Sequence, residues 1–307
     1  MQTKQSIPLR QAWALALEQQ TRAVFTTYDL ALTLWGLYRD RSVGGRQLRV
    51  VNTWPNRADF LRLRKELLNA AVLKPVAGLR EGLAYTLLGR TDDSPDELAC
   101  ALDPFACVSH LSAMAHYGLT DRMPEQIYLT SPGDALWRSL AGERMLRDLG
   151  EELSTFVKAG LPALRRIKSD RISGRPVHRH TAATAGGFRA ILGSSLRVAN
   201  LGRTFLDMLR EPRLCGGIVH VLSVYEEHAR PNLRLILDEL DRHGTAIDKV
   251  RAGYILEERC GLNDPRISAW VQLAARGGSR RLDAAVEYSP RFSERWALSI
   301  NVPEALP

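Results

Sequence analysis

The sequence predicts an α+β protein with a small amino-terminal domain over residues 1–90 and a larger mixed domain over residues 91–307. Three observations lead to this prediction. The first 90 residues combine helical apolar patterns with a short pair of strand-like runs. The remainder holds mixed strands to about residue 200, helical patterns to about 276 and terminal strands. All of the net positive charge belongs to the first segment.

The charge distribution separates the two segments. Residues 1–90 contain 14 Lys and Arg against 6 Asp and Glu, whereas residues 91–307 contain 28 of each class. The formal net charge of +8 therefore comes from the first 90 residues. Such asymmetry is typical of a chain in which one module neutralises phosphates. A basic surface kept for solubility is the alternative explanation.

Composition excludes several classes of protein. Hydrophobic residues make up 45% of the chain, which is ordinary for a globular protein. No apolar run approaches the ~20 residues of a membrane span, and residues 1–10 lack the apolar core of a secretory signal. We therefore expect a cytoplasmic protein without a membrane partner. Four widely spaced cysteines form no Cys-x-x-Cys pair, which predicts buried, reduced thiols.

The amino-terminal segment has a recognisable order of elements. Helices are predicted over residues 11–22, 28–38 and 57–71, with Thr26 or Thr27 capping the second and Asn56 the third. Strands are predicted over residues 48–51, 72–76 and 83–88, with a glycine-flanked turn at 77–82. Helices followed by a short hairpin with a basic tip predict a winged helix-turn-helix.

The helix over 57–71 is amphipathic. Phe60, Leu63, Leu67, Ala70 and Ala71 fall on one side, whereas the opposite arc carries Arg62, Lys65, Glu66 and Asn69. Arg64 falls inside the apolar arc, where its methylene stem can carry the charge toward solvent.

The polar arc and the hairpin supply candidate DNA-binding residues. Arginine and asparagine read guanine and adenine edges bidentately, so Arg62, Lys65 and Asn69 are predicted to approach bases. Phosphate contacts are predicted for Arg57, Lys74 and Arg80. A winged helix that serves only protein interaction is the competing interpretation.

The second segment begins after a linker at residues 90–97, where Ser94, Pro95 and Glu97 predict a capping box. Residues 109–117 predict a helix ended by Gly118, and residues 126–130 a strand. Strands are predicted within residues 153–200, in the runs LSTFVKAG, RRIKSD, GFRAILG and SLRVAN. Helices are predicted over 201–210, 216–229, 232–243, 245–259 and 264–275, and strands over 284–288 and 296–302.

No catalytic signature is present, so neither an enzyme nor a cofactor is predicted. His178 and His180 share one face of a predicted strand, but no neighbouring Cys, Asp or Glu completes a metal site. A metal-dependent nuclease would need clustered carboxylates and a lysine. Asp283 and Glu287 are candidates, yet Ser289 stands where the lysine would help.

Two further charged stretches have simpler explanations than catalysis. Asp238, Glu239 and Asp241 are explained as the solvated face of a helix. A basic run is explained either as a second phosphate-contacting surface or as a solvated hairpin loop. Its residues are Arg165, Arg166, Lys168, Arg171 and Arg175.

Three stretches resemble the AbiEi family, the antitoxin and autorepressor component of type IV toxin–antitoxin systems of phage abortive infection. They are CVSHLSAMAHYGLTDRMPEQIYLTSP at 107–132, LRVANLGRTFLDMLREPRLCGGIVHVL at 196–222 and RFSERWALSINVP at 291–303. The resemblance implies binding to inverted repeats in the chain's own promoter, and a carboxy-terminal domain that counters a nucleotidyltransferase-like toxin without a stable complex. Within an Arg-Thr-x-x-Asp-like phrase, Arg203 and Asp207 are expected to pair on one helix face.

Together these features predict a cofactor-free, DNA-binding transcriptional repressor. Its partners would be double-stranded promoter DNA and, functionally, a nucleotidyltransferase-like toxin. The alternatives are a metal-dependent nuclease and a stand-alone ligand-sensing transcription factor.

Overall fold

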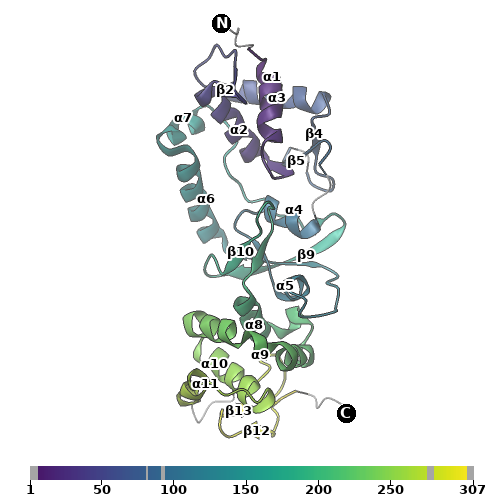
Figure 1. Cartoon of the computed structure of the whole chain (residues 1–307), viewed down its shortest axis with the longest axis vertical. Coiled ribbons are helices and arrows are strands. Elements are labelled where there is room, and N and C mark those ends of the chain that lie inside the picture. Colours follow the sequence, from purple (N-terminus) through teal and green to yellow (C-terminus); the bar gives the residue numbers. More distant parts are fainter. Residues whose placement is uncertain (1–5, 81, 91–93, 275–279, 303–307) are drawn as a thin grey trace. The chain divides into compact units, whose positions relative to one another are not determined.

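The computed structural model describes residues 6–80, 82–90, 94–274 and 280–302 (Figure 1). The predicted mixed α+β class is confirmed, including the helical region toward the carboxy terminus. Contacts divide the chain into two compact units. Unit 1 comprises Met1–Ala106, Thr130–Gly186 and Ala190–Arg197, and unit 2 comprises Cys107–Leu129, Gly187–Arg189 and Val198–Pro307. Residues 1–5, and parts of the predicted turn, linker and last helix (81, 91–93 and 275), lie outside the described residues.

The amino-terminal elements of unit 1 run in the order α1, β1, α2, β2, β3, α3, β4, β5 (Figure 1). They span α1 Leu9–Glu18, β1 Val24–Thr26, α2 Thr27–Asp40, β2 Ser42–Val43, β3 Arg46–Gln47, α3 Arg57–Asn69, β4 Leu73–Pro75 and β5 Ala84–Leu87. Strands β1, β5 and β4 form an antiparallel sheet in that order, with Phe25 opposite Tyr85 and Lys74 opposite Thr86. Thr26 caps α2 as predicted, since its hydroxyl accepts a hydrogen bond from the Asp29 amide.

The predicted strand at residues 48–51 is wrong. Its apolar residues do not enter a sheet: Leu48 makes an isolated bridge with Ile7, and Val51 is fully exposed. The strand pair lies just before it, where β2 and β3 pair through Val43 and Arg46 around two glycines.

The rest of unit 1 combines helices with a strand hairpin. Its elements are α4 Pro95–Leu102, the second half of β7 Ile127–Pro132, α6 Asp134–Leu149, η1 Gly150–Glu152, α7 Leu153–Lys158, β8 Arg171–Ile172 and β9 Arg175–Ala182. The strands lie in the order β7-β9-β8. The strand prediction for LSTFVKAG is wrong, because these residues form α7. Phe156 fixes one face of α7 by packing edge-on against the rings of Tyr28 and Trp35.

The core of unit 1 is common to its amino-terminal helices and to α6 and α7. Trp13 and Trp35 belong to the same buried cluster as Trp137 and Phe156. Hydrogen bonds reinforce this packing, since the Trp35 indole donates to Glu152 at 2.7 Å. The division into two units therefore does not use the predicted boundary at residue 90. That residues 1–90 form a separate domain stays a prediction.

Unit 2 is mainly helical around one apolar core. Its elements are β6 Cys107–Val108, α5 His110–His116, the first half of β7, most of β10 Phe188–Ala190 and of β11 Arg197–Ala199, α8 Leu201–Arg210, η2 Pro212–Cys215, α9 Ile218–His243, α10 Ala246–Gly253, η3 Tyr254–Arg259, α11 Pro265–Trp270, η4 Val271–Leu273, β12 Phe292–Ser293 and β13 Leu298–Ser299. Strand β11 runs parallel to β6, and β6 neighbours β7. The predicted Arg203–Asp207 pair is confirmed at 2.8 Å, and Gly118 has the expected left-handed backbone with φ +65°.

The elements of unit 2 differ from the prediction at two places. The helices expected at 216–229 and 232–243 are one helix, α9, which continues through Pro231 because residues on both sides of it, such as Tyr225 and Leu237, enter the same core. Residues 284–288 are not a strand. The Asn301 amide instead donates to the carbonyls of Asp283 and Val286, which holds this stretch in a turn.

Among the described residues, no helix combines the length and apolarity that a membrane crossing requires. None of the four cysteines, all of them described, forms a disulfide, and three are buried while Cys260 is half-buried.

Candidate nucleic-acid interface

Helix α3 begins at a well-formed cap. The Asn56 side chain accepts a hydrogen bond from the Asp59 amide at 3.0 Å, and the Asp59 carboxylate accepts one from the Asn56 amide at 3.3 Å. The Arg57 amide donates to the Ala159 carbonyl at 3.0 Å, and Gly160 lies against the Arg57 side chain. The first turn of α3 is therefore engaged by the segment that follows α7, which leaves the middle and end of α3 as its open part.

One face of α3 is fixed in the core. Phe60, Leu63 and Leu67 are buried as predicted, and the Phe60 ring lies 5.9 Å from that of Trp13. Arg64 was expected to extend toward solvent, but it does not. Its guanidinium lies over the rings of Phe60 and Tyr85, at 5.6 and 5.8 Å from their centroids, which is a cation–π arrangement.

The opposite face of α3 is exposed and polar. It carries Arg57, Arg62, Lys65 and Asn69, all predicted to contact DNA, together with Leu61, an exposed residue from the margin of the apolar side. Arg62 is already paired, with Glu66 at 3.0 Å and Asp59 at 3.5 Å. No carboxylate of the described residues forms an ion pair with Lys65. Lys65 and Asn69 are thus the side chains most available to a partner.

The β4–β5 hairpin carries two further cations. Lys74 lies on β4 and Arg80 in the turn before β5, and both side chains are exposed. Gly78 and Gly82 supply the positive φ values, +78° and +88°, that the turn needs. A groove of about 780 Å³ separates α3 from β4. Its lining includes Leu61, Lys65, Leu68, Asn69, Lys74 and Leu88.

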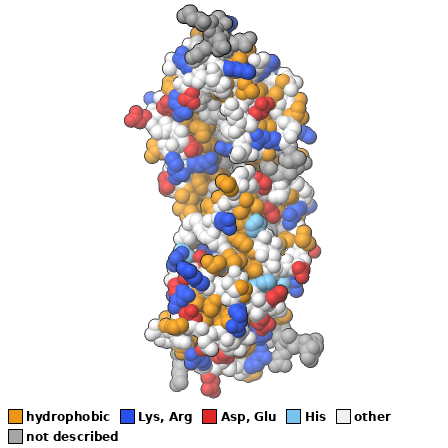
Figure 2. All heavy atoms as spheres, in the orientation of Figure 1, with side chains coloured by type: hydrophobic (Ala, Val, Ile, Leu, Met, Phe, Trp, Pro, Cys, Tyr) orange, Lys and Arg blue, Asp and Glu red, His pale blue; other side chains and the backbone are white. Residues whose placement is uncertain are grey.

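The remaining positive charge is spread more widely. In Figure 2, the visible face over the first helices shows Lys and Arg side chains interspersed with acidic and hydrophobic ones rather than one unbroken patch. The candidate interface is therefore a limited group of cations on α3 and the β4–β5 hairpin, not the whole basic surplus of residues 1–90.

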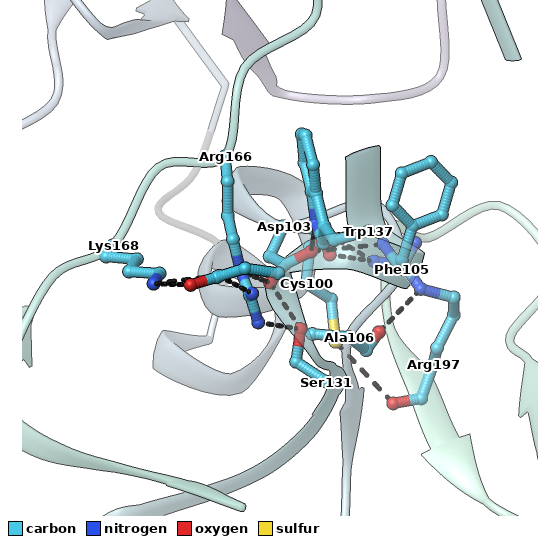
Figure 3. Close-up of polar contacts among 10 residues, drawn as sticks. Cys100, Asp103, Phe105, Ala106, Ser131, Trp137, Arg166, Lys168 and Arg197 are labelled. Atoms are coloured by element: carbon cyan, nitrogen blue, oxygen red, sulfur yellow. Dashed lines mark hydrogen bonds and ion pairs between the residues drawn. The ribbon is translucent and has the colours of Figure 1, made fainter. Parts of the chain in front are cut away.

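The predicted second phosphate-contacting surface is largely committed to contacts within unit 1. Arg166 is only about 10% exposed and donates to Asp103, Ser131 and Asp134 (Figure 3). Lys168 also donates to Asp134, at 3.0 Å. The hydrogen bond from Lys168, and to a smaller extent that from Arg166, lowers the pKa of the Asp134 carboxyl.

The other members of this run are placed separately. Arg171 donates to the Gly174 carbonyl within the β8–β9 hairpin, and Arg175 lies 4.0 Å from Asp96. Arg165 is exposed. Neighbouring Arg179 is partly buried, and its burial lowers the pKa of the guanidinium. The five predicted cations therefore do not form one open surface.

Asp103 is the buried polar centre of unit 1, and it was not among the predicted site residues. Its carboxylate is fully buried and accepts hydrogen bonds from the Ser131 hydroxyl at 2.7 Å, the Trp137 indole at 2.8 Å and Arg166 at 3.3 Å (Figure 3). The Phe105 amide is a fourth donor, at 3.2 Å. The carboxylate is thus saturated, which fits a role in holding α4, β7, α6 and residue 166 together.

The side chains considered for a metal site do not come together. Within the part of the chain that the structure describes, no group of three or more His, Cys, Asp or Glu side chains is placed to hold a metal, His178 and His180 included. Asp283 is buried and accepts from the Ala285 amide at 2.9 Å, whereas Glu287 is exposed.

The acidic residues of α9 are only partly the solvated face that was expected. Asp238 pairs with Arg266 at 2.8 Å, and Asp241 accepts from the Trp270 indole at 3.2 Å. Glu239 is buried, because α8 packs along α9 and brings Arg203 to within 4.0 Å of it.

Comparisons with known proteins find a likeness in structure but not in sequence. No protein-family model matches the chain, and no curated protein matches it in sequence. The crystal structure of the RV2827C protein from Mycobacterium tuberculosis is similar to it, with 15% sequence identity and a TM-score of 0.48. That likeness covers 94% of this chain and 89% of the other.

Proposed function

We propose that this chain binds double-stranded DNA as a transcriptional repressor, through a winged helix-turn-helix formed by its amino-terminal elements. The order α1-β1-α2-β2-β3-α3-β4-β5, with an antiparallel sheet in the order β1-β5-β4, supports the proposal. In that fold the third helix enters the major groove and the hairpin lies along the backbone. The single observation that carries the proposal is the exposed group of cations on α3 and β4.

The outward face of α3 suits base contacts. Lys65 and Asn69 are four residues apart, so their side chains project from the same face of the helix. Lysine can donate to guanine and asparagine can bind adenine bidentately, while exposed Leu61 offers an apolar contact for a thymine methyl.

Arg62 must exchange partners on binding. Its exposed pairs with Glu66 and Asp59 are of the kind that contributes only ~0.3–0.5 kcal/mol on a helix. A charge-assisted hydrogen bond to a base or a phosphate can replace them. Arg57, Lys74 and Arg80 would then contact phosphates on either side of the groove.

The biological role in this proposal rests on the family resemblance. The chain would act in the cytoplasm without a cofactor, repress its own operon at inverted repeats and counter a nucleotidyltransferase-like toxin without a stable complex. The stretches that carry the resemblance are 107–132, 196–222 and 291–303.

DNA binding is tested by fluorescence anisotropy with a fragment from upstream of the chain's own reading frame and a scrambled fragment of equal length. The double variant Arg62→Ala/Lys65→Ala should bind the upstream fragment more weakly, by roughly 1–3 kcal/mol for each side chain that reads a base. The matched control is Arg234→Ala/Arg242→Ala, which removes two exposed arginines from α9. Equal affinity for both fragments, or an unaffected Arg62/Lys65 variant, would contradict the proposal.

The antitoxin role needs a separate experiment. Co-expression with the product of the reading frame immediately downstream should relieve that product's toxicity. A downstream product that is not nucleotidyltransferase-like, or toxicity that persists, would leave a DNA-binding repressor without the antitoxin role.

A further inference from the structure

Unit 1 contains a small polar cavity apart from the candidate DNA interface. Its volume is about 200 Å³, and its walls come from β1, α2, α4, α6 and the segment before β11. The residues that line it include Arg22, Thr26, Asp29, Cys100, Ala101, Arg144, Ser195 and Arg197.

Three guanidinium groups meet at this cavity, against one carboxylate in its lining. Arg22 donates to Asp29 at 2.5 Å. Arg144 lies 3.9 Å from the same carboxylate and 3.4 Å from Asp148. Asp29 is nearly buried and contacts two arginines, whereas Asp148 does not line the cavity, so the lining itself carries three arginines and one carboxylate.

Arg197 has a different environment. Its guanidinium donates to the backbone carbonyls of Ala106 and Asp103, each at 2.8 Å, and of Cys100 (Figure 3). It also donates to the Ser195 carbonyl at 3.2 Å. Over the described ranges, no carboxylate lies within ion-pair distance of it. Within these ranges, only the dipoles of backbone carbonyls therefore stabilise the positive charge of Arg197. An anion bound beside this partly buried charge would stabilise it further.

We propose that this cavity binds a small oxyanion, either a carboxylate or a phosphate, between Arg22, Arg144 and Arg197. The forks of Arg22 and Arg144 match the geometry of both anions, whereas Arg197, which already donates to four backbone carbonyls, contributes mainly its charge. The volume favours a small ligand, because it is below the ~300–1,000 Å³ of pockets for drug-sized molecules and equals that of roughly six or seven water molecules at ~30 Å³ each.

Binding of the anion would cost the hydrogen bond between Arg22 and Asp29 but not the cap of α2. The second oxygen of the Asp29 carboxylate accepts from the Thr26 amide at 2.9 Å and the Thr26 hydroxyl at 2.6 Å, which caps α2. Arg22 binds the first oxygen. The guanidinium of Arg22 can therefore turn to a ligand while the cap of α2 stays formed.

The test is isothermal titration calorimetry with inorganic phosphate and with malonate, against sodium chloride of equal ionic strength. At least one of the two oxyanions should bind saturably, and which one binds distinguishes a phosphate from a carboxylate site. The variant Arg22→Gln should bind it roughly tenfold more weakly, since a charge-assisted hydrogen bond is removed. Arg147→Gln, an exposed arginine on the same helix as Arg144, should bind like the wild type.

A second variant keeps the test decisive if Arg22→Gln folds poorly. Ala101→Asp places a carboxylate in the lining of the cavity, so it should abolish oxyanion binding, and a cooperative thermal melt checks that this variant is folded. Absence of saturable binding by both oxyanions, or unchanged binding in Ala101→Asp, would overturn the proposal. No DNA enters this measurement, so its failure is separate from failure of the proposed DNA binding.

Discussion

The substitution Asp103→Asn tests the buried polar centre of unit 1. Asp103 is fully buried, and four donors converge on its two carboxylate oxygens. An amide has one acceptor oxygen, and its NH₂ group would face donors, so at least one buried hydrogen bond is broken. Removing one member of a buried ion pair costs about 3–5 kcal/mol. Because Arg166 keeps its contact with Asp134 at 2.7 Å, we expect a destabilisation of about 3 kcal/mol, at the lower end of this range.

Urea unfolding followed by tryptophan fluorescence measures this effect, since Trp137 donates directly to Asp103. With an m-value of roughly 3 kcal/mol/M, the unfolding midpoint should fall by about 1 M. Asp134→Asn is the matched control, because Asp134 binds the same Arg166 but is 69% exposed, and its midpoint should change much less. A shift for Asp103→Asn no larger than that for Asp134→Asn would refute the account of this centre.

Two other predictions concern Gly202 and Cys260 of unit 2, with Gly142 of unit 1 as a control. A β-carbon on Gly202 would lie 2.3 Å from the Leu235 carbonyl oxygen, so Gly202→Ala should push α8 away from α9 and lower the free energy of unfolding by about 1–3 kcal/mol. The control Gly142→Ala has open space around the new β-carbon and should raise the free energy of unfolding by up to about 1 kcal/mol. Equal effects in thermal melts would count against the close packing. Burial raises the pKa of the Cys260 thiol from 9.0 to about 11, so the alkylation rate of Cys260 in the folded protein should rise with a midpoint near pH 11. The contribution of this thiol to the free energy of unfolding should be complete below pH 9 and should be lost as the pH increases toward 11. A midpoint near 9 would contradict this burial.

Local sequence signals predicted much of the fold. The caps at Thr26 and Asn56 depend on side chains within three residues of each helix start, and the buried face of α3 depends on a 3.6-residue period. Both are independent of the rest of the chain. The same is true of the Arg203–Asp207 pair, whose members are four residues apart on one helix.

Long-range contacts account for the features that the sequence did not reveal. The side chains that bind Asp103 lie 28, 34 and 63 residues further along the chain, so no local pattern marks this residue. For the same reason, Arg166 was predicted to lie in an exposed basic run, although its side chain is nearly buried. The β-prone residues of LSTFVKAG predicted a strand, but packing of Phe156 against the amino-terminal helices favours a helix there.

The salt dependence of DNA affinity is the most direct test of the central proposal. If Arg57, Lys74 and Arg80 each contact a phosphate, the logarithm of the association constant should fall with the logarithm of salt concentration with a slope of about −2.7 per protomer. The variant Lys74→Ala should bring this slope to about −1.8 while leaving the preference for the upstream fragment unchanged. A slope near zero for the wild-type protein, or the same slope in both proteins, would contradict binding through α3 and the β4–β5 hairpin.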